Sequence, residues 1–423
     1  MEPIPTTARA STASGGPAEA KGAAKLIRHF RQILLWPLQL MPIRAGSQIQ
    51  KHWEMLRQAS AGNPWRELAD EFTGDSARFQ ERHYNEFVTF LPQVQRFLYG
   101  EGIGREARPW LAESPIRVFR RSDLAGVRIT YDDNLAPAIF RIAHVDLYFF
   151  FDIDVAVLAL EVHADDLSLE RAQDTLYRFG RAYPLNWDAG GKAANCLQKV
   201  EWLSASGAVL AVSDFEQRDR YLSFVRQHRA PCIGAHWEFV LRPLAHHDSD
   251  QSGLIRYRHL EYHRMPVAAY LAIDDPHVLS RTDFIGLAVL VGPGGTGKSL
   301  PFSDQHLRDF EARYCYDRDW SDKGGHHSTR FLCGGSSFMV VGDHGNRAFA
   351  DAETGVLGQF RHQYFLLFLI AHFHKAALLM LSERLVESLH RLDISDADSV
   401  KRFKRAIRQV FEIFLRFTHR YWF

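Results

Sequence analysis

The pattern of apolar and polar positions changes along the chain and divides it into four parts. Residues 1–24 are mostly Ala, Ser, Thr, Pro and Gly, so we expect a disordered arm with too little apolar surface to order it. Apolar positions recur at helical spacing over 25–104, mix strand-like with helical runs over 105–350, and become helical again over 351–423. The sequence therefore predicts an α+β or α/β protein, in which a mixed β-sheet is layered with helices and followed by long C-terminal helices.

The segment 25–44 predicts a basic amphipathic helix. Leu26, Phe30 and Ile33 recur at helical spacing, with arginines on the opposite side. Two interpretations stay open, because such a helix can pack on the core of its own domain or lie on a membrane surface or in the groove of a partner. Further helices are predicted over 48–100. The first part of the chain is therefore expected to be a helical region ahead of a sheet domain.

The central part is expected to form a mixed α/β cytosolic domain. Its longest apolar run, 139–162, starts with an alternation that predicts one wet face and continues as an unbroken hydrophobic stretch. This run is too long for one strand, so at least two are expected. Residues 196–224 predict another helix or two. Three further strand-like runs and a closing strand pair lie at 236–244, 265–274, 284–292 and 331–343.

The C-terminal part predicts two long helices that form a stalk. The first covers about 357–391, and the second begins at Ser395 or Asp396. Apolar residues of the second helix repeat every seven positions, at Val400, Ile407, Phe414 and Tyr421 and at Phe403, Val410 and Phe417. A sevenfold repeat predicts that a helix packs along another helix, either antiparallel within the same chain or in a second copy.

The most apolar stretch, 365–381, is expected to be a buried core helix rather than a membrane span. Its length as a helix falls short of a hydrocarbon core of about 30 Å. His372, His374 and Lys375 lie within it and would be costly in lipid.

Composition excludes several classes of protein. The chain of 423 residues has 51 Lys and Arg against 50 Asp and Glu, so no net field favours a nucleic acid partner. Apolar residues make up 46% and charged residues 24%, which is typical of a folded globular protein. The four cysteines have no C-x-x-C spacing, so we expect reduced thiols rather than a disulfide scaffold or zinc ribbon.

One glycine-rich segment matches the phosphate-binding loop G-x-x-x-x-G-K-S. It runs from Gly292 to Ser299, with Gly297 and Lys298 at the required positions, and it follows a strand-like run. Such a loop must lead directly into a helix, yet Pro301 opposes a helix start at this point. A soluble nucleotide-binding protein therefore stays open as the alternative function, beside a glycine-rich surface hairpin.

A pair of carboxylates is the candidate metal site. Asp152 and Asp154 lie two residues apart in FFFDIDV and would share a face if this segment were a strand. Carboxylates of this kind bind Mg²⁺ or Ca²⁺; the alternative is a turn with solvated or arginine-paired aspartates. No G-x-S-x-G or other nucleophile signature occurs, so no catalytic residue is assigned and we expect no enzyme unless the phosphate loop hydrolyses a nucleotide.

Four long strings together resemble one family of membrane proteins. They are 128–162, 307–320, 358–386 and 403–423, and they resemble the cytosolic part of bacterial proteins described as CorA-like magnesium transporters. The resemblance implies an α/β/α cytosolic domain, long helices leading to the membrane, two transmembrane helices and a pentameric pore. The Gly-Met-Asn triplet that marks this group is not in the chain, so no pore residue can be assigned.

The resemblance also implies a function and a location. We expect the cytosolic sensor and stalk region of a divalent-cation transporter or channel, on the cytoplasmic side of an inner or plasma membrane. Mg²⁺ would be the transported or regulatory ion, held by carboxylates at contacts between subunits of a homo-oligomer. Because the last helix ends on Tyr421, Trp422 and Phe423 without a stop signal, we expect the natural protein to continue past Phe423 into membrane segments.

Overall fold

The structure is a computed structural model. It describes residues 25–43, 51–59, 62–68, 72, 80–100, 114–132, 135–260, 263–292, 300, 302–323 and 327–420. The arm expected over 1–24 lies outside the described residues.

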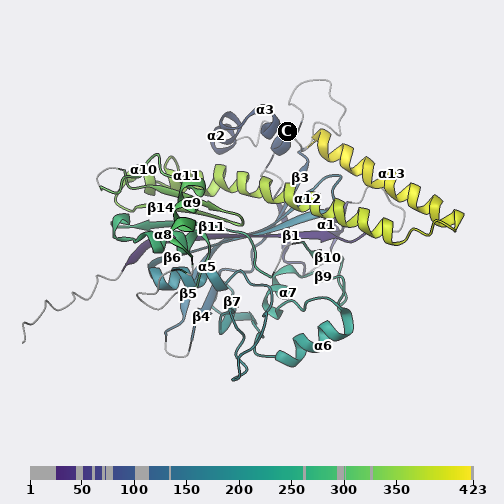
Figure 1. The fold of residues 1–423 in the computed structure, drawn as a ribbon, viewed down its shortest axis with the longest axis horizontal. Helices are drawn as coiled ribbons and strands as arrows, with labels where there is room; N and C mark the ends of the chain where they lie inside the picture. The colour runs from purple at the N-terminus through teal and green to yellow at the C-terminus, as the bar shows by residue number, and fades with distance from the viewer. Residues whose placement is uncertain are drawn as a thin grey trace, which may run out of the picture.

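A large mixed sheet forms the centre of the protein (Figure 1). Within the described residues it has 14 strands, with the main order β12-β13-β14-β11-β1-β6-β5-β4-β7-β8; β10 and β9 continue from β1, and β3 and β2 continue from β5. The strands are β1 (Leu26–Leu40), β2 (Trp65–Leu68), β3 (Ile116–Arg121), β4 (Gly126–Thr130), β5 (Ala138–Phe150), β6 (Val155–Ser168), β7 (Lys199–Leu203), β8 (Val209–Val212), β9 (Leu244–His246), β10 (Ile255–His259), β11 (Val267–Ile273), β12 (Cys315–Tyr316), β13 (Arg330–Gly334) and β14 (Ser337–Asp343).

Helices cover both faces of this sheet. They are α1 (His52–Gln58), α2 (Glu81–Thr89), α3 (Pro92–Tyr99), α5 (Leu169–Arg178), α6 (Arg218–His228), α7 (Ala235–Leu241), α8 (Arg281–Ala288), α9 (Asp304–Tyr314), α10 (Arg347–Ala350), α11 (Val356–Gln359), α12 (Phe365–His390) and α13 (Ala397–Arg420), with short turns η1 (Pro276–Val278) and η2 (Phe360–Tyr364). One core joins the sheet to α5, α7 and α8, and a second core joins the other face to α3, α12 and α13. The expected mixed sheet with layered helices and long C-terminal helices is therefore confirmed.

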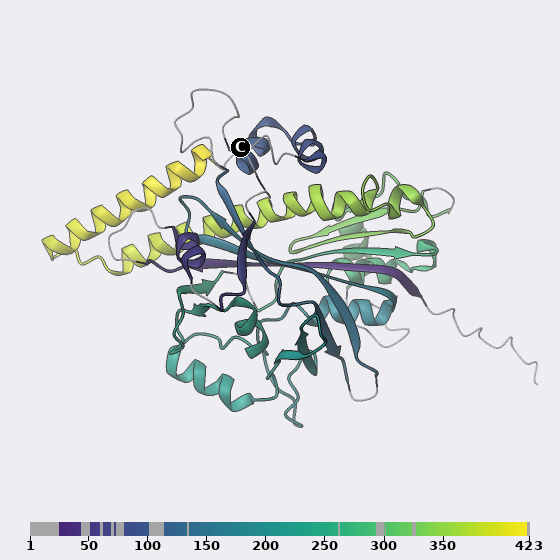
Figure 2. The same ribbon diagram turned by 180° about the vertical axis from the view of Figure 1, so that it is seen from behind.

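The segment expected to be an amphipathic helix is instead the central strand. β1 pairs antiparallel with β6 from Leu26 opposite Ser168 to Gln39 opposite Val155, and it crosses the middle of the sheet (Figure 2). Pro37 fits because β1 changes its other neighbour there, from β11 to β10. Proline has no backbone N–H to donate, but at Pro37 β1 lies between the segments that pair with β11 and with β10, so no hydrogen bond between strands is lost there. The helix prediction for 25–44 is wrong.

The strand predictions for the central part are borne out only in part. The run 139–162 forms the two strands β5 and β6, 265–274 contains β11, and 331–343 forms the hairpin β13–β14. In contrast, 236–244 begins as helix α7 and 284–292 begins within helix α8. The second error had a visible signal: Ser280 and Asp283 form a capping box at the start of α8. Residues 196–224 contain β7, β8 and the start of α6 rather than helices alone.

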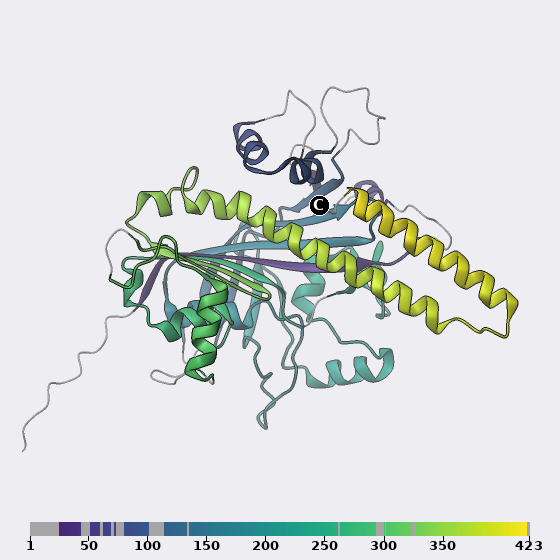
Figure 3. The ribbon, with the colours of Figure 1, turned by 45° about the horizontal axis from the view of Figure 1, so that its top comes forward.

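The two long C-terminal helices lie side by side along one face of the sheet (Figure 3). On α13, Phe417 is fully buried and Val410 is partly buried against the same core, whereas Phe414 is 39% exposed. One of the two sevenfold positions therefore faces inward, against a partner helix of the same chain. Val356–His390 is long and apolar enough to cross a membrane, but 61% of its most apolar window is buried in the protein, as expected for a core helix.

Candidate functional site

The turn between β5 and β6 carries both candidate metal ligands and is bound by the C-terminal helices. An oxygen of Asp154 accepts a hydrogen bond from Arg384 of α12, and Asp152 lies 3.4 Å from a guanidinium nitrogen of Arg416 of α13. Asp152 has a φ of 64°, a left-handed conformation that Asp tolerates better than most residues. The two aspartates therefore act as anchors for two helices more than 200 positions away in sequence.

The arginines occupy the position in which a cation would neutralise these carboxylates. His52 of α1 adds a nitrogen 3.9 Å from Asp154, and burial lowers the pKa of this histidine. Among the described residues, no three His, Cys, Asp or Glu side chains are grouped as metal ligands. The arginine-paired interpretation fits this turn, and a preformed Mg²⁺ site at Asp152 and Asp154 does not. Cation binding here stays a prediction that requires the arginines to be displaced.

A second constellation was not anticipated from the sequence. It is a chain of hydrogen bonds and ion pairs across β3, β5, β6 and β1, which we call the charge chain. Its members, in spatial order, are Arg120, Asp146, His144, Glu161, Arg31, His29, Asp165 and Arg141.

The centre of the charge chain is deeply buried. Asp146 and Glu161 are each 1% exposed, and His144 lies between them, with nitrogen–oxygen distances of 3.2 and 2.7 Å. Arg120 binds Asp146 through two hydrogen bonds of 2.7 Å, and Arg31 binds Glu161. Charges thus alternate from Arg120 to Arg31, so each buried carboxylate has partners of opposite sign.

Strand register explains how these side chains meet. Arg141 lies opposite His163, yet His144 lies opposite Glu161, so the register of β5 shifts between Ile142 and His144. Because the bulge adds one residue to β5, the side chains of Arg141 and His144, one before and one after it, lie on the same face of the sheet. The predicted wet face is therefore wrong: the bulge interrupts the alternation, and the side chain of His144 lies beneath the C-terminal helices, where the ring of Phe365 is 6.2 Å from that of His144.

The electrostatics fix the protonation of the charge chain. Burial alone would lower the pKa of His144, but hydrogen bonds to Asp146 and Glu161 outweigh it and raise the pKa to about 10. Burial opposes ionisation of Glu161, and His144 and Arg31 more than compensate, so its pKa falls to about 2. His29 is held differently, because burial lowers its pKa. Its Nε2 accepts from Arg31 at 3.1 Å and its Nδ1 faces Asp165 at 2.7 Å, which selects the neutral ring with the proton on Nδ1.

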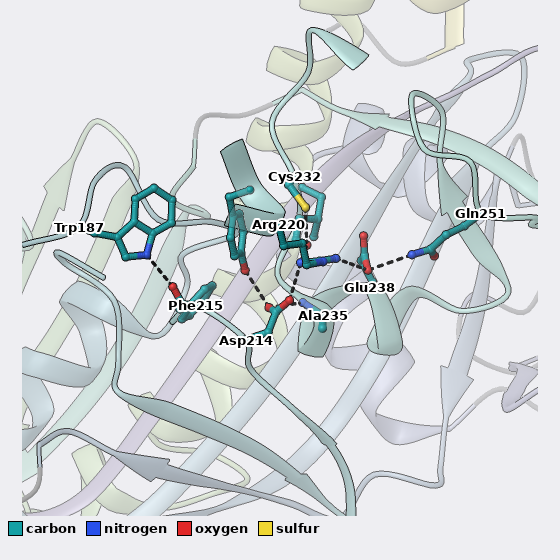
Figure 4. A network of polar contacts seen from close by, with 10 residues as sticks. Trp187, Asp214, Phe215, Arg220, Cys232, Ala235, Glu238 and Gln251 are labelled. Carbon is teal, nitrogen blue, oxygen red and sulfur yellow. Dashed lines mark hydrogen bonds and ion pairs between the residues drawn. The ribbon is translucent and has the colours of Figure 1, made fainter. Parts of the chain in front are cut away.

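A third polar cluster joins α6 and α7 to the loop after β8 (Figure 4). Asp214 accepts from the Tyr221 hydroxyl at 2.8 Å, from the Ala235 amide at 2.9 Å and from Arg220 at 2.5 Å. Arg220 also donates to Glu238 at 3.0 Å. Burial raises the pKa of nearby Cys232 to about 12, so its thiol is not a ready nucleophile. This cluster fastens helices together.

A pocket of about 690 Å³ opens between α8, α9 and the loop that follows β12. Arg281 and Glu311 form an ion pair on its wall, and Arg330 binds Asp317 at 2.9 and 3.0 Å. The ring of Trp320 stacks on His277 with centroids 4.6 Å apart. The pocket is large enough for a small ligand, but its arginines already have carboxylate partners.

The phosphate-loop interpretation loses its structural context. The segment before Gly292 contains helix α8 rather than a strand. The phosphate-binding motif requires a strand, then the loop, then a helix, so the strand predicted ahead of the loop is wrong. Gly292 has a packing reason of its own, since a Cβ at this position would lie 2.7 Å from the ring of Tyr177. Gly297, Lys298 and Ser299 lie outside the described residues.

Comparisons of the chain with protein-family models, with curated proteins and with solved structures returned no match.

Proposed function

We propose that this chain is the cytosolic sensor and stalk region of a CorA-like divalent-cation transporter or channel, with Mg²⁺ as the transported or regulatory ion. The observation that carries the proposal is the double attachment of the C-terminal helices to the central hairpin, through Arg384 to Asp154 and Arg416 to Asp152. A transporter of this type needs a folded domain that is mechanically joined to helices leading toward a membrane. The sequence resemblance and the order of sheet domain and long helices add to this support.

The attachment suggests how the domain would pass on a signal. The β5–β6 hairpin belongs to the middle of the sheet, and both of its strands contribute to the core that α12 and α13 share. Because packed cores deform little, a shift of the helices would require the two ion pairs to break or to move with the sheet. A cation can bias such a shift only by binding one arrangement better than the other.

The proposal assigns the regulatory carboxylates to contacts between subunits. The assembly would be a homo-oligomer, pentameric by the resemblance, and the domain would lie on the cytoplasmic side of an inner or plasma membrane. In this arrangement a single chain contributes only part of each regulatory cation site. Asp152 and Asp154 would act mainly as anchors of the helices.

The test uses the complete gene product. We expect its reading frame to continue past codon 423 into two apolar spans of about 20 residues, and the purified protein in liposomes to take up Mg²⁺. Asp154→Asn should alter the dependence of flux on internal Mg²⁺ by loosening the helices. Lys298→Ala, in the phosphate-loop-like segment, serves as the matched control and should leave flux unchanged.

Two results would contradict the proposal. One is a stop codon after codon 423 in a protein recovered from the soluble fraction. The other is saturable binding of labelled ATP that is lost in Lys298→Ala, since this would restore the nucleotide-binding alternative.

A further inference from the structure

Helix α13 has two apolar stripes, and only one of them packs against the core of the protein. The inward stripe includes Ile413, which is 7% exposed, and Phe417, which is fully buried. The second stripe faces solvent: Phe411 is 59% exposed, Phe414 39% and Leu415 50%. Large apolar groups that remain exposed next to each other on a folded domain mark a surface that contacts something else.

Basic side chains occupy the same outward face of α13. Lys404, Arg408, Phe411 and Leu415 follow one another at spacings of four, three and four residues, which places them on a single line along the helix. Arg405 lies beside this line, and all three basic residues are exposed. Within the described part of the chain, no ion pair is formed by Lys404, Arg405 or Arg408.

The neighbouring helix extends the apolar part of this surface. Leu378, Leu385 and Leu389 of α12 are spaced seven and four residues apart and are 41%, 42% and 51% exposed. The opposite side of α12, with Phe373 and Met380 fully buried, faces the core. The end of α12 and helix α13 lie side by side and reach past the sheet at one side of the molecule (Figure 3), and these exposed side chains are available to a partner.

Charge decides between a second copy and a lipid surface. In a parallel contact between identical α13 faces, or an antiparallel contact centred near Arg405, the basic residues Lys404, Arg405 and Arg408 would lie close to the same positive charges of the second copy, which is unfavourable. The acidic residues of α13 do not offset them, because Asp398 and Glu412 are paired with Lys401 and Arg416. Anionic lipid headgroups would neutralise the basic groups, while the exposed aromatic and leucine side chains enter the boundary of the acyl chains.

We propose that the outward face of α13, defined by Lys404, Arg405, Arg408, Phe411 and Leu415, binds the surface of an anionic membrane, with the exposed leucines of α12 beside it. This contact deepens the proposed function, because it would hold the outward face of α13 close to the headgroups of the cytoplasmic leaflet. It does not depend on transport, and the purified chain is sufficient to test it.

The experiment is flotation of the purified 423-residue chain with vesicles of phosphatidylcholine, alone or mixed with phosphatidylglycerol. We expect binding to the mixed vesicles only, with affinity falling as salt rises from about 0.05 to 0.5 M because the charge interaction is screened. The pair Lys404→Glu and Arg408→Glu should lower the affinity at least about tenfold. Phe411→Ser with Leu415→Ser should also weaken binding, while circular dichroism and thermal unfolding remain unchanged.

A matched control separates this face from net charge. Arg218→Glu with Arg226→Glu changes the total charge equally, on exposed positions of α6 on the other side of the sheet (Figure 1). This control should bind mixed vesicles as the wild type does; an equal loss would overturn the proposal. It would also be overturned if the wild type did not float with the mixed vesicles. A third contrary result is self-association of the wild type without lipid that the Lys404→Glu and Arg408→Glu pair abolishes, since the face would then be a contact between copies.

These outcomes are separable from failure of the proposed function. A chain that binds vesicles but whose reading frame lacks membrane spans would keep the lipid-binding face and refute the transporter. A full-length transporter whose isolated 423-residue chain ignores anionic vesicles would do the reverse.

Discussion

Arg384 of α12 and Asp154 of the β5–β6 turn form an ion pair across 230 positions of sequence. Both side chains are largely buried, with 18% and 16% of their side-chain surface exposed. The second pair, Arg416 with Asp152, is longer at 3.4 Å and more exposed at 33% and 20%. The two pairs are therefore unequal: the first is the main attachment of the helices to the sheet, and the second assists it.

We expect Asp154→Asn to destabilise the fold by about 1–3 kcal/mol, because Arg384 would be left partly buried without its carboxylate. Urea unfolding of the wild type, both single variants and the double variant with Arg384→Gln measures the coupling energy of the pair. The same cycle on Asp152 and Arg416 is the internal comparison and should give less than about 1 kcal/mol. Equal coupling in the two cycles would contradict the ranking of the attachments.

Mg²⁺ should bind weakly at this turn as long as the arginines are present, since each carboxylate is already neutralised by a guanidinium group. Replacing both arginines by glutamine removes the competing charges, and we expect this variant to bind Mg²⁺ more tightly, by about tenfold. Calorimetric titration of the two proteins compares the affinities. Adding Asp152→Asn and Asp154→Asn to the variant should abolish the gain. A wild type with tight Mg²⁺ binding that requires Asp152 would show that the arginines do not block the site.

The central strand illustrates what the sequence could not disclose. Helical periodicity places Arg31 on a polar side, because the sequence gives no hint that Arg31 and His29 have the partners Glu161 and Asp165, which lie 130 and 136 positions away. Once these partners are in place, charged residues can lie on a buried face of a sheet at little cost. Local periodicity therefore predicted the wrong element, because ion pairs with distant strands take the place of the solvent that charged side chains would otherwise need.

Other elements were predictable because their signals are local. Ser303 caps α9 and Ser168 caps α5 through hydrogen bonds of 3.3 Å to backbone amides, as helix-start patterns predict. The presence of two strands within 139–162 followed from the length of the run alone. The anchoring role of Asp152 and Asp154 was visible only as one of two alternatives, because the arginines that decide it belong to helices at the far end of the chain.

Acid should destabilise the protein through its buried neutral histidines. Burial lowers the pKa of His236 to about 3 and that of His246 to about 4, both below the unfolded value near 6.5. Protonation is therefore easier in the unfolded state, so this part of the stability is present above about pH 6.5 and is lost as the pH falls toward 4 and 3.

The variant His236→Leu tests the largest of these contributions. Its ring is fully buried against Phe215 and Trp237, at centroid distances of 5.0 and 5.2 Å, so an apolar replacement keeps most of the packing. We expect urea unfolding to show a shallower loss of stability between about pH 6.5 and 4 than in the wild type. An unchanged slope would mean that His236 does not become protonated on unfolding in this range.

Whereas acid destabilises the protein through its buried neutral histidines, alkaline pH should destabilise it through the charge chain, whose central histidine is charged. The folded pKa of His144 is raised to about 10 by Asp146 and Glu161, so the stability from its charged form is complete below about pH 6.5 and is lost as the pH rises through about 10. The ring resonances of His144 in an NMR titration should move only near pH 10.

His144→Leu should cost about 3 kcal/mol at pH 7, because two buried carboxylates lose a partner. Arg141→Gln, at the exposed end of the charge chain, is the control and should cost less than about 1 kcal/mol. If His144 instead titrates near pH 6.5, the ring is not held as a cation between the two carboxylates, and the alternation of charge across the sheet fails at its centre.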